Sequence, residues 1–381
     1  MNYQDVQRSL LRLHQWRATY NGDELGRGID QYKPSEAYHY AEAYALWGIG
    51  YLTLFQLTRE PLFLDLAEKA AEWLQKHPSP KYQHYSWGLP WEWETWEAPK
   101  ELSYLITTVF AGRLFLALYR VTHKKHLLKI AQDIACWIEK ENGGESTPDG
   151  RYFYYANFDG LRLPIINTTS AAGGFFALLY EVTQEEHYYR VCRETVRWTL
   201  RQQTTCGTWR YSPQTWLEDN VHTAFTLEGL WQAHLCCQER EWLSPLKKGT
   251  LAYWRFFFSE NGYGQERKRG NFRDLAKMPF RRWVKDMSIK LKLLPNDIPE
   301  TRLHGYGSAL RALALASYAE PHWLKKAWRI YLHVENHLAM DDGSYAFRER
   351  ESVAYIRHQA HFFAGLSFLA RRLQEAKCSI P

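Results

Sequence analysis

The chain repeats one unit, in which a short aromatic loop containing glycine is followed by two helical patterns. Six loop glycines mark the repeat, with separations of 60, 62, 57, 55 and 81 residues: Gly28, Gly88, Gly150, Gly207, Gly262 and Gly343. Several of these loops open with the same kind of phrase, such as Gly150-Arg-Tyr-Phe and Gly343-Ser-Tyr-Ala-Phe. A period of this length indicates an array of helical hairpins.

Apolar periodicity predicts twelve helices, over residues 3–20, 35–58, 61–77, 101–122, 125–141, 169–183, 185–203, 221–238, 241–259, 306–319, 321–339 and 355–376. The first helix after each loop is the more apolar of its pair, and apolarity on all sides indicates burial. The first and last helices have no other partner, so we expect them to pair and close a ring. The prediction is an all-α fold, an (α/α)6 toroid of six helical hairpins forming one domain over residues 1–381, with an open solenoid as the alternative.

A basic insertion at about 263–302 interrupts the repeat. Between Glu266 and Lys292 the chain has ten Lys or Arg against three Asp or Glu, whereas the whole chain has a net charge of only +6. The rest of the surface is therefore close to neutral, which argues against a nucleic-acid partner. Three interpretations stay open for residues 266–292: a basic amphipathic helix on an anionic membrane surface, a lid that attracts a polyanionic glycan, or a solvated excursion.

Several function classes lack their sequence signatures. There is no glycine-rich nucleotide loop, no HExxH, no GxSxG, and no clustered aspartates of the kind that activate isoprenoids. The six cysteines do not have metal-finger spacing, so no metal and no cofactor are expected. No run approaches 18 apolar residues, and the N-terminus lacks a basic-then-apolar pattern. We expect a cytoplasmic protein, peripheral at the inner face of the membrane if the insertion contacts lipid.

The predicted topology places every glycine loop on one face of the ring. The N-termini of six inner helices would converge there on a funnel, and their free N–H groups favour an anionic ligand. The loops carry much of the aromatic content, which is 16% of the chain. Rings interleaved with polar side chains are typical of a surface that stacks sugars, although many of these rings are also expected to pack the hairpin tips.

The most informative stretch runs from Gly207 to the helix predicted at 221–238. Asp219 and His222 lie three residues apart at its start, so they share one helix face. Asp219 is either a plain N-cap or the partner of a proton-transferring His222. In the last hairpin, Tyr355 and Arg357 suit a substrate carboxylate and a phenolic acid or base.

Motifs in five segments resemble those of poorly characterised toroid proteins encoded in bacterial exopolysaccharide clusters. They are WGLPWEWETWEAPKE, INTTSAAGGFFALL, GTWRYSPQTWLEDNVHTAFTLEGLW, LHGYGSALRAL and YIRHQAHFFAGL, between about residues 80 and 370. That family is similar in architecture to polysaccharide lyases, uronyl C5-epimerases, N-acylglucosamine 2-epimerases and unsaturated-glucuronyl hydrolases. One departure is His358, where the family tends to have tryptophan.

The residues and the resemblance together define the expected site. The candidate catalytic residues are His222, Asp219, Tyr211, Tyr355, Arg357 and Glu92. The candidate substrate-binding residues are Trp91, Trp93, Tyr154, Asn157, Asn167, Trp209, His304, Tyr306 and His358.

Three functions remain in competition. The first is a lyase or C5-epimerase on a uronic-acid-containing or lipid-linked bacterial glycan, in which His222 with Tyr211 or Tyr355 supplies acid and base, and Arg357 neutralises the carboxylate. The second is a glycoside hydrolase that uses Glu92 and Asp219. The third is a non-catalytic glycan-binding or scaffold protein of a polysaccharide assembly complex.

Overall fold

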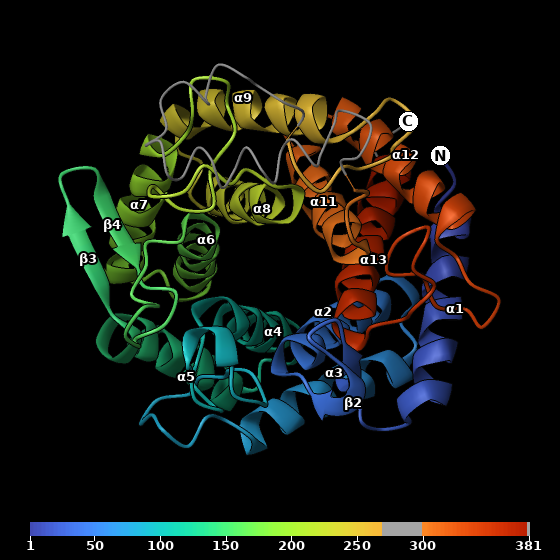
Figure 1. Cartoon of the computed structure of the whole chain (residues 1–381), viewed down its shortest axis with the longest axis horizontal. Helices are drawn as coiled ribbons and strands as arrows, with labels where there is room; N and C mark the ends of the chain where they lie inside the picture. Colours follow the sequence, from blue (N-terminus) through green and yellow to red (C-terminus); the bar gives the residue numbers. More distant parts are fainter. Residues whose placement is uncertain (269–298, 379–381) are drawn as a thin grey trace.

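Two concentric rings of helices make up the protein, as a computed structural model shows for residues 1–268 and 299–378 (Figure 1). The inner ring consists of α2 (Ala41–Thr58), α4 (Leu105–Thr122), α6 (Ile166–Thr183), α8 (Asn220–Cys237), α11 (Leu303–Ala316) and α13 (Ile356–Cys378). The outer ring consists of α1 (Tyr3–Asn21), α3 (Pro61–Lys76), α5 (Lys125–Cys136), α7 (Glu186–Arg201), α9 (Arg240–Phe257) and α12 (His322–His337).

The inner ring is closed. Each inner helix packs on the next, and α13 packs on α2. Each outer helix packs mainly on one inner helix, and α3, α5, α7 and α12 also touch the next one. Helix α1 packs on α13, as the unpaired ends of the sequence predicted. The structure therefore confirms the (α/α)6 toroid and contradicts the open solenoid.

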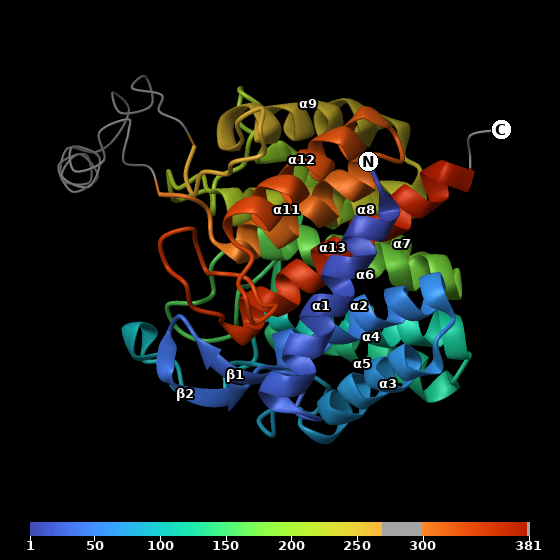
Figure 2. The same cartoon turned by 90° about the vertical axis from the view of Figure 1, so that its right-hand side faces the viewer.

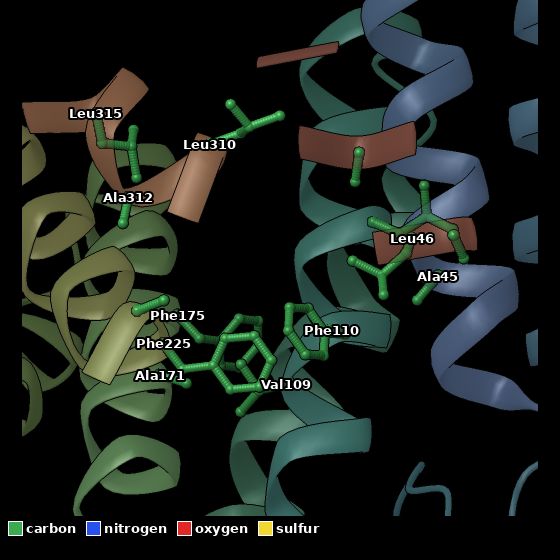
Figure 3. Close-up of a cluster of buried hydrophobic side chains, with 14 of the residues drawn as sticks. Ala45, Leu46, Val109, Phe110, Ala171, Phe175, Phe225, Leu310, Ala312 and Leu315 are labelled. Carbon is green, nitrogen blue, oxygen red and sulfur yellow. The ribbon is translucent and has the colours of Figure 1, made fainter. Parts of the chain in front are cut away.

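Burial explains why the two rings differ in sequence. In α6 every residue from Ile166 to Leu179 is buried, because neighbours enclose an inner helix on all sides. In α7 the buried positions recur at helical spacing, for example at Tyr188, Val191 and Thr195. Figure 3 shows the result at the centre, where Phe110 of α4 and Phe225 of α8 point towards each other.

The small strands lie in the loops that precede inner helices. Strands β1 (Arg27–Asp30) and β2 (Lys33–His39) form one antiparallel hairpin, and β3 (Gly144–Thr147) and β4 (Gly150–Phe153) form the other. The helix predicted at 35–58 begins only at Ala41, so its first six residues were assigned wrongly. Pro34 favours an extended chain at its start, and residues 33–39 pair with β1 instead.

The loops before the inner helices gather at one end of the ring (Figure 2). The turn into this end needs glycine at Gly262, where φ is +93° and a Cβ would lie 2.3 Å from the carbonyl oxygen of Arg329. Helix α4 is apolar and long enough to cross a membrane by length and composition, but 72% of it is buried inside the protein, as expected of a core helix. Residues 269–298, which carry most of the predicted membrane contact or lid, lie outside the described residues.

Candidate active site

A cavity of about 440 Å³ opens at the end of the ring where the inner helices begin. It is bordered by eight of the predicted site residues: Trp91, Glu92, Trp93, Asn167, Tyr211, His222, His304 and Arg357. Tyr32, Lys33, Glu42, Trp96, Tyr155 and Arg302 also border it, and the sequence analysis did not select them. The volume is within the range of small-molecule sites.

The first N–H groups of the inner helices are not all free for a ligand, contrary to our expectation. The first N–H of α6 donates to the carbonyl oxygen of Tyr211 at 3.1 Å, and that of α11 donates to Phe347 at 2.9 Å. The first N–H groups of α4 and α8 are paired with loop carbonyls in the same way. Four of the six inner helices are thus tied to a neighbouring loop, which fixes these loops around the cavity and reduces the attraction of those helix ends for an anion.

Asp219 and His222 form a pair with two contacts beside this cavity. One carboxylate oxygen of Asp219 accepts the backbone N–H of His222 at 2.8 Å, and the other lies 2.5 Å from His222 Nδ1. The two alternatives left by the sequence, a helix cap and an Asp–His pair, are therefore both realised by the same side chain. Burial raises the pKa of Asp219, but the charge and hydrogen bonds of His222 outweigh it, and the pKa is lowered.

The second ring nitrogen of His222 is left for the cavity. Because Nδ1 lies against a buried carboxylate, Nδ1–H is assigned as the donor, and Nε2, which has no hydrogen-bond partner among the described residues, is the acceptor. The side chain is 30% exposed, whereas that of Asp219 is only 5% exposed. Tyr211 packs edge-on to His222 with 4.6 Å between ring centroids, and burial raises its pKa, so its hydroxyl stays protonated. Tyr211 is thus a proton donor rather than the base that we also considered.

His304 supplies a second imidazole at the cavity. It is buried, and its Nε2 has no hydrogen-bond partner among the described residues. Burial, together with neighbouring His361 and His358, lowers its pKa well below the usual value, so the ring is neutral. Asn167 also borders the cavity with a buried, unpartnered Oδ1. Such atoms suit the hydroxyl groups of a ligand.

Arg357 borders the cavity but has internal partners, which corrects its predicted role. Its Nε and Nη2 donate to the two oxygens of Asp30 at 3.0 and 3.3 Å, and its Nη1 donates to Glu42 at 3.4 Å. Burial alone would raise the pKa of Glu42, but the charges and hydrogen bonds of Arg357 and His361 outweigh burial and lower the pKa to about 2. The guanidinium therefore balances two buried carboxylates and is not left free to neutralise a substrate carboxylate.

Aromatic and acidic side chains of the loop after Gly88 form another wall. Trp91 packs against Tyr38 and Tyr40 at 5.4 and 5.2 Å, and Trp93 packs edge-on to Tyr104. Glu92 lies exposed on this wall. Because Asp219 is held by His222, it is not the free second carboxylate that a Glu92–Asp219 hydrolase needs.

Other predicted residues lie away from the cavity. Trp209 is buried, and its indole N–H donates to the carbonyl oxygen of Thr199 at 2.9 Å, so it packs a hairpin tip. Tyr306 donates to Glu300 at 2.7 Å behind the site.

Tyr154 and Asn157 are held in the β3–β4 region by hydrogen bonds to Glu145 and to the backbone of Glu141. Tyr355 borders an adjacent open pocket together with Asp219 and His222. His358 is buried behind His304 and does not border the cavity.

Glu42, His304 and His361 offer ligand atoms within 4.8 Å of one another, as a metal site would. Their surroundings do not suit a cation. Arg311 donates to Nδ1 of His361 at 3.3 Å, so the proton of that ring is on Nε2, which donates to Glu42 at 2.7 Å. The rings of His304 and His361 pack face to face with a tilt of 31° and 3.7 Å between centroids. Within the cluster, His361 is held by Glu42 and Arg311, and His304 packs against its ring.

Residues that the sequence analysis missed carried a recognisable signal. Glu42, Arg113, Glu228 and Arg311 are charged residues within otherwise apolar inner helices. Such a residue is stable only when it is paired, so its presence indicates a buried ion-pair network.

Comparisons with known proteins agree with this fold. No protein-family model matches the chain, and no curated protein matches it in sequence. Among solved structures, it is similar to a cellobiose 2-epimerase from Bacillus thermoamylovorans, with a TM-score of 0.67, 13% identity and coverage of 97% of this chain and 99% of that one.

Two further structures have the same likeness. An α-mannanase of family GH76 from Bacteroides thetaiotaomicron has a TM-score of 0.71 and 11% identity, and the alignment covers 100% of this chain and 98% of that one. A sugar epimerase from a ruminal bacterium has a TM-score of 0.70 and 12% identity, with coverage of 96% and 98%. These likenesses show the (α/α)6 toroid fold.

Proposed function

We propose that this chain is a carbohydrate-active enzyme that removes and returns a proton at a sugar carbon next to a carbonyl or carboxyl group. The observation that carries the proposal is His222, whose Nδ1 is held by the buried carboxylate of Asp219 while its other nitrogen is left for an aromatic-lined cavity. A buried carboxylate fixes the tautomer of an imidazole and stabilises the imidazolium that forms when it accepts a proton. The toroid neighbours that act on sugars support the same class.

Each residue has a role in this reaction. His222 takes the proton from the sugar carbon and leaves an enol or enolate. Tyr211, whose pKa is raised, donates a hydrogen bond to the developing oxyanion, as the ring N–H of neutral His304 also can, and the imidazolium of His222 gives the proton back to carbon. Trp91 and Trp93 stack the sugar, and Asn167 accepts from a hydroxyl group.

Epimerisation is the favoured outcome. Return of the proton to the opposite face inverts the carbon. Either the enol intermediate turns its other face to the imidazolium of His222, or the protonated Tyr211 hydroxyl delivers a proton and is reprotonated from His222. A lyase is the second candidate. Lys33 and Arg302 border the cavity, and the carboxylate of a uronic acid would share them with their present partners, Glu94 at 3.7 Å and Glu266 at 2.9 Å. In that reaction loss of the C5 proton expels the substituent at C4 and leaves a C4–C5 double bond.

The setting proposed for this activity is bacterial polysaccharide biosynthesis or modification, on an acidic or lipid-linked oligosaccharide. The stem of the basic insertion supports it. Two antiparallel backbone bridges form this stem, one between Gln265 and Glu300 and one between Arg267 and Asp219. The stem therefore joins the ring of helices beside the proposed base. A membrane contact and a cytoplasmic location remain part of this proposal.

The test is incubation of the protein in heavy water with neutral disaccharides and with uronic-acid glycans. Deuterium next to the carbonyl without cleavage indicates an epimerase, and unsaturated ends indicate a lyase. His222→Gln should reduce incorporation by at least about 100-fold. His84→Gln is the matched control, because His84 has the same contact with Asp133 at 2.7 Å, away from the cavity. Equal loss in both variants would overturn the assignment, and saccharide affinity without exchange would favour a binding protein.

A further inference from the structure

A second cavity lies at the opposite end of the ring. It has a volume of about 390 Å³ and is enclosed by the C-terminal halves of the inner helices. Apolar side chains form most of its wall, among them Leu46, Ile49, Leu52, Leu178, Leu235 and Phe368. Among the described residues, none borders both this cavity and the candidate active site.

Three rings separate the two cavities. Phe110 borders the second cavity, Phe225 borders the candidate active site, and their centroids are 5.6 Å apart. His361 contacts both, at 5.5 and 5.6 Å. Figure 3 shows Phe110 and Phe225 facing each other between the inner helices. The second cavity is therefore a separate space with its own floor.

The floor of the second cavity carries an excess positive charge. Glu228 accepts from Arg113 at 2.7 Å and from Arg311 at 3.0 Å, and all three side chains are at most 9% exposed. Two guanidinium groups thus share one carboxylate. All three residues lie in the middle of their helices, where a helix dipole does not act. Arg113 Nε is buried and has no hydrogen-bond partner among the described residues.

The rim repeats this imbalance. Arg371 and Arg372 share Glu375, at 3.0 and 2.6 Å, and Arg120 pairs with Glu181. The rim therefore has three arginines against two carboxylates. Guanidinium groups bind carboxylates and phosphates through paired hydrogen bonds, and a buried cation is costly unless an anion balances it.

We infer that the second cavity is a binding site for an amphipathic organic anion. Its carboxylate or phosphate group meets the arginines, and its apolar part lies against the leucine and phenylalanine side chains.

The site is connected to the candidate active site by hydrogen bonds. Arg311 donates to the carbonyl oxygen and to Nδ1 of His361, and His361 donates to Glu42. Glu42 in turn accepts from Arg357, which also pairs with Asp30. Beneath the candidate active site two carboxylates thus share one arginine, whereas beneath the second cavity two arginines share one carboxylate. The two floors therefore carry excess charges of opposite sign.

Calorimetric titration tests the inference without knowledge of the reaction. The probes are octyl phosphate below its micelle concentration, inorganic phosphate, and 1-octanol as the neutral analogue without a sugar. Octyl phosphate should bind at least about tenfold more tightly than either of the others, because both the charge and the chain contribute. Equal binding of 1-octanol would overturn the anion site, and equal binding of inorganic phosphate would overturn the amphipathic ligand.

Variants locate the binding. Ala117→Phe fills the half-buried wall and should weaken octyl phosphate at least about tenfold. Arg371→Gln, on the exposed rim, should weaken it about threefold or more. Arg8→Gln is the control, because Arg8 is 78% exposed in a pair with Asp5 and does not border the cavity. Unchanged affinity in Ala117→Phe would overturn the location.

Glu228→Gln tests the sign of the floor charge. Removal of the shared carboxylate should tighten the binding of octyl phosphate and leave that of 1-octanol unchanged. Weaker binding of octyl phosphate by a folded variant would contradict the charge argument, and thermal unfolding checks the fold. If this variant does not fold, Ala117→Phe and Arg371→Gln decide.

Discussion

The carboxylate of Asp219 lies 2.5 Å from Nδ1 of His222 and also caps the helix that carries it. One side chain therefore fixes both the start of α8 and the tautomer of the proposed base.

Asp219→Asn should lower kcat by about 100-fold or more, with little change in KM. Asparagine still caps the helix, so the fold should persist, but its amide does not stabilise the imidazolium. Asp133→Asn is the matched control at the His84 pair outside the cavity. An equal loss of kcat in the control, or none in Asp219→Asn, would contradict the role of Asp219.

Acid should destabilise the protein between about pH 6.5 and pH 4. Burial lowers the pKa of His361 from 6.5 to about 4, so below pH 6.5 the unfolded chain takes up a proton that the native chain does not. The stability from the neutral ring is present above pH 6.5 and is lost as the pH falls through this window. A shift of this size corresponds to about 3 kcal/mol.

Urea unfolding at a series of pH values measures this loss. His361→Gln should reduce the slope of unfolding free energy against pH, whereas His322→Gln, at an exposed position, should not. An unchanged slope in His361→Gln would show that the other buried histidines, His304 and His358, carry the effect instead.

The fold was predictable because its repeat is local. Loop glycines and the contrast between inner and outer helices are visible within each 60-residue unit. The pairing of the chain ends followed from ring closure, and α1 does pack on α13. The start of α2 was missed because β2 is held by a partner strand rather than by its own pattern.

The site was predictable only where a residue acts within its own segment. Asp219 and His222 are three residues apart, so their contact follows from helical spacing. Arg357 and Asp30 are 327 residues apart, and no local pattern indicates that they pair. Trp93 and Trp209 occupy similar loops, yet one borders the cavity and the other packs a hairpin tip, because neighbouring segments decide which rings are covered.

Arg357→Gln should cost about 3–5 kcal/mol of unfolding free energy, because it leaves Asp30 and Glu42 as buried carboxylates without their cation. Arg27→Gln, in an exposed pair with Glu24, should cost less than about 1 kcal/mol. Urea unfolding compares the two. If Arg357→Gln keeps full stability and loses only saccharide affinity, the guanidinium contacts the ligand and is not a positioning group.

Close packing of α6 and α8 should make Gly229 intolerant of a side chain. A Cβ at Gly229 would lie 2.3 Å from the carbonyl oxygen of Ser170, and a backbone atom has little freedom to move. Gly229→Ala should therefore cost about 1–3 kcal/mol despite the better helix propensity of alanine.

Gly173→Ala is the comparison within the same ring of helices, because its Cβ would meet side-chain atoms alone, with Thr195 Cγ2 the nearest at 3.3 Å. Alanine there should change the unfolding free energy by less than about 1 kcal/mol, since the gain in helix propensity offsets the tighter contact. Chemical denaturation of both variants measures the difference. Equal stability of the two would mean that α6 and α8 separate easily and that their packing is a loose constraint on the closed inner ring.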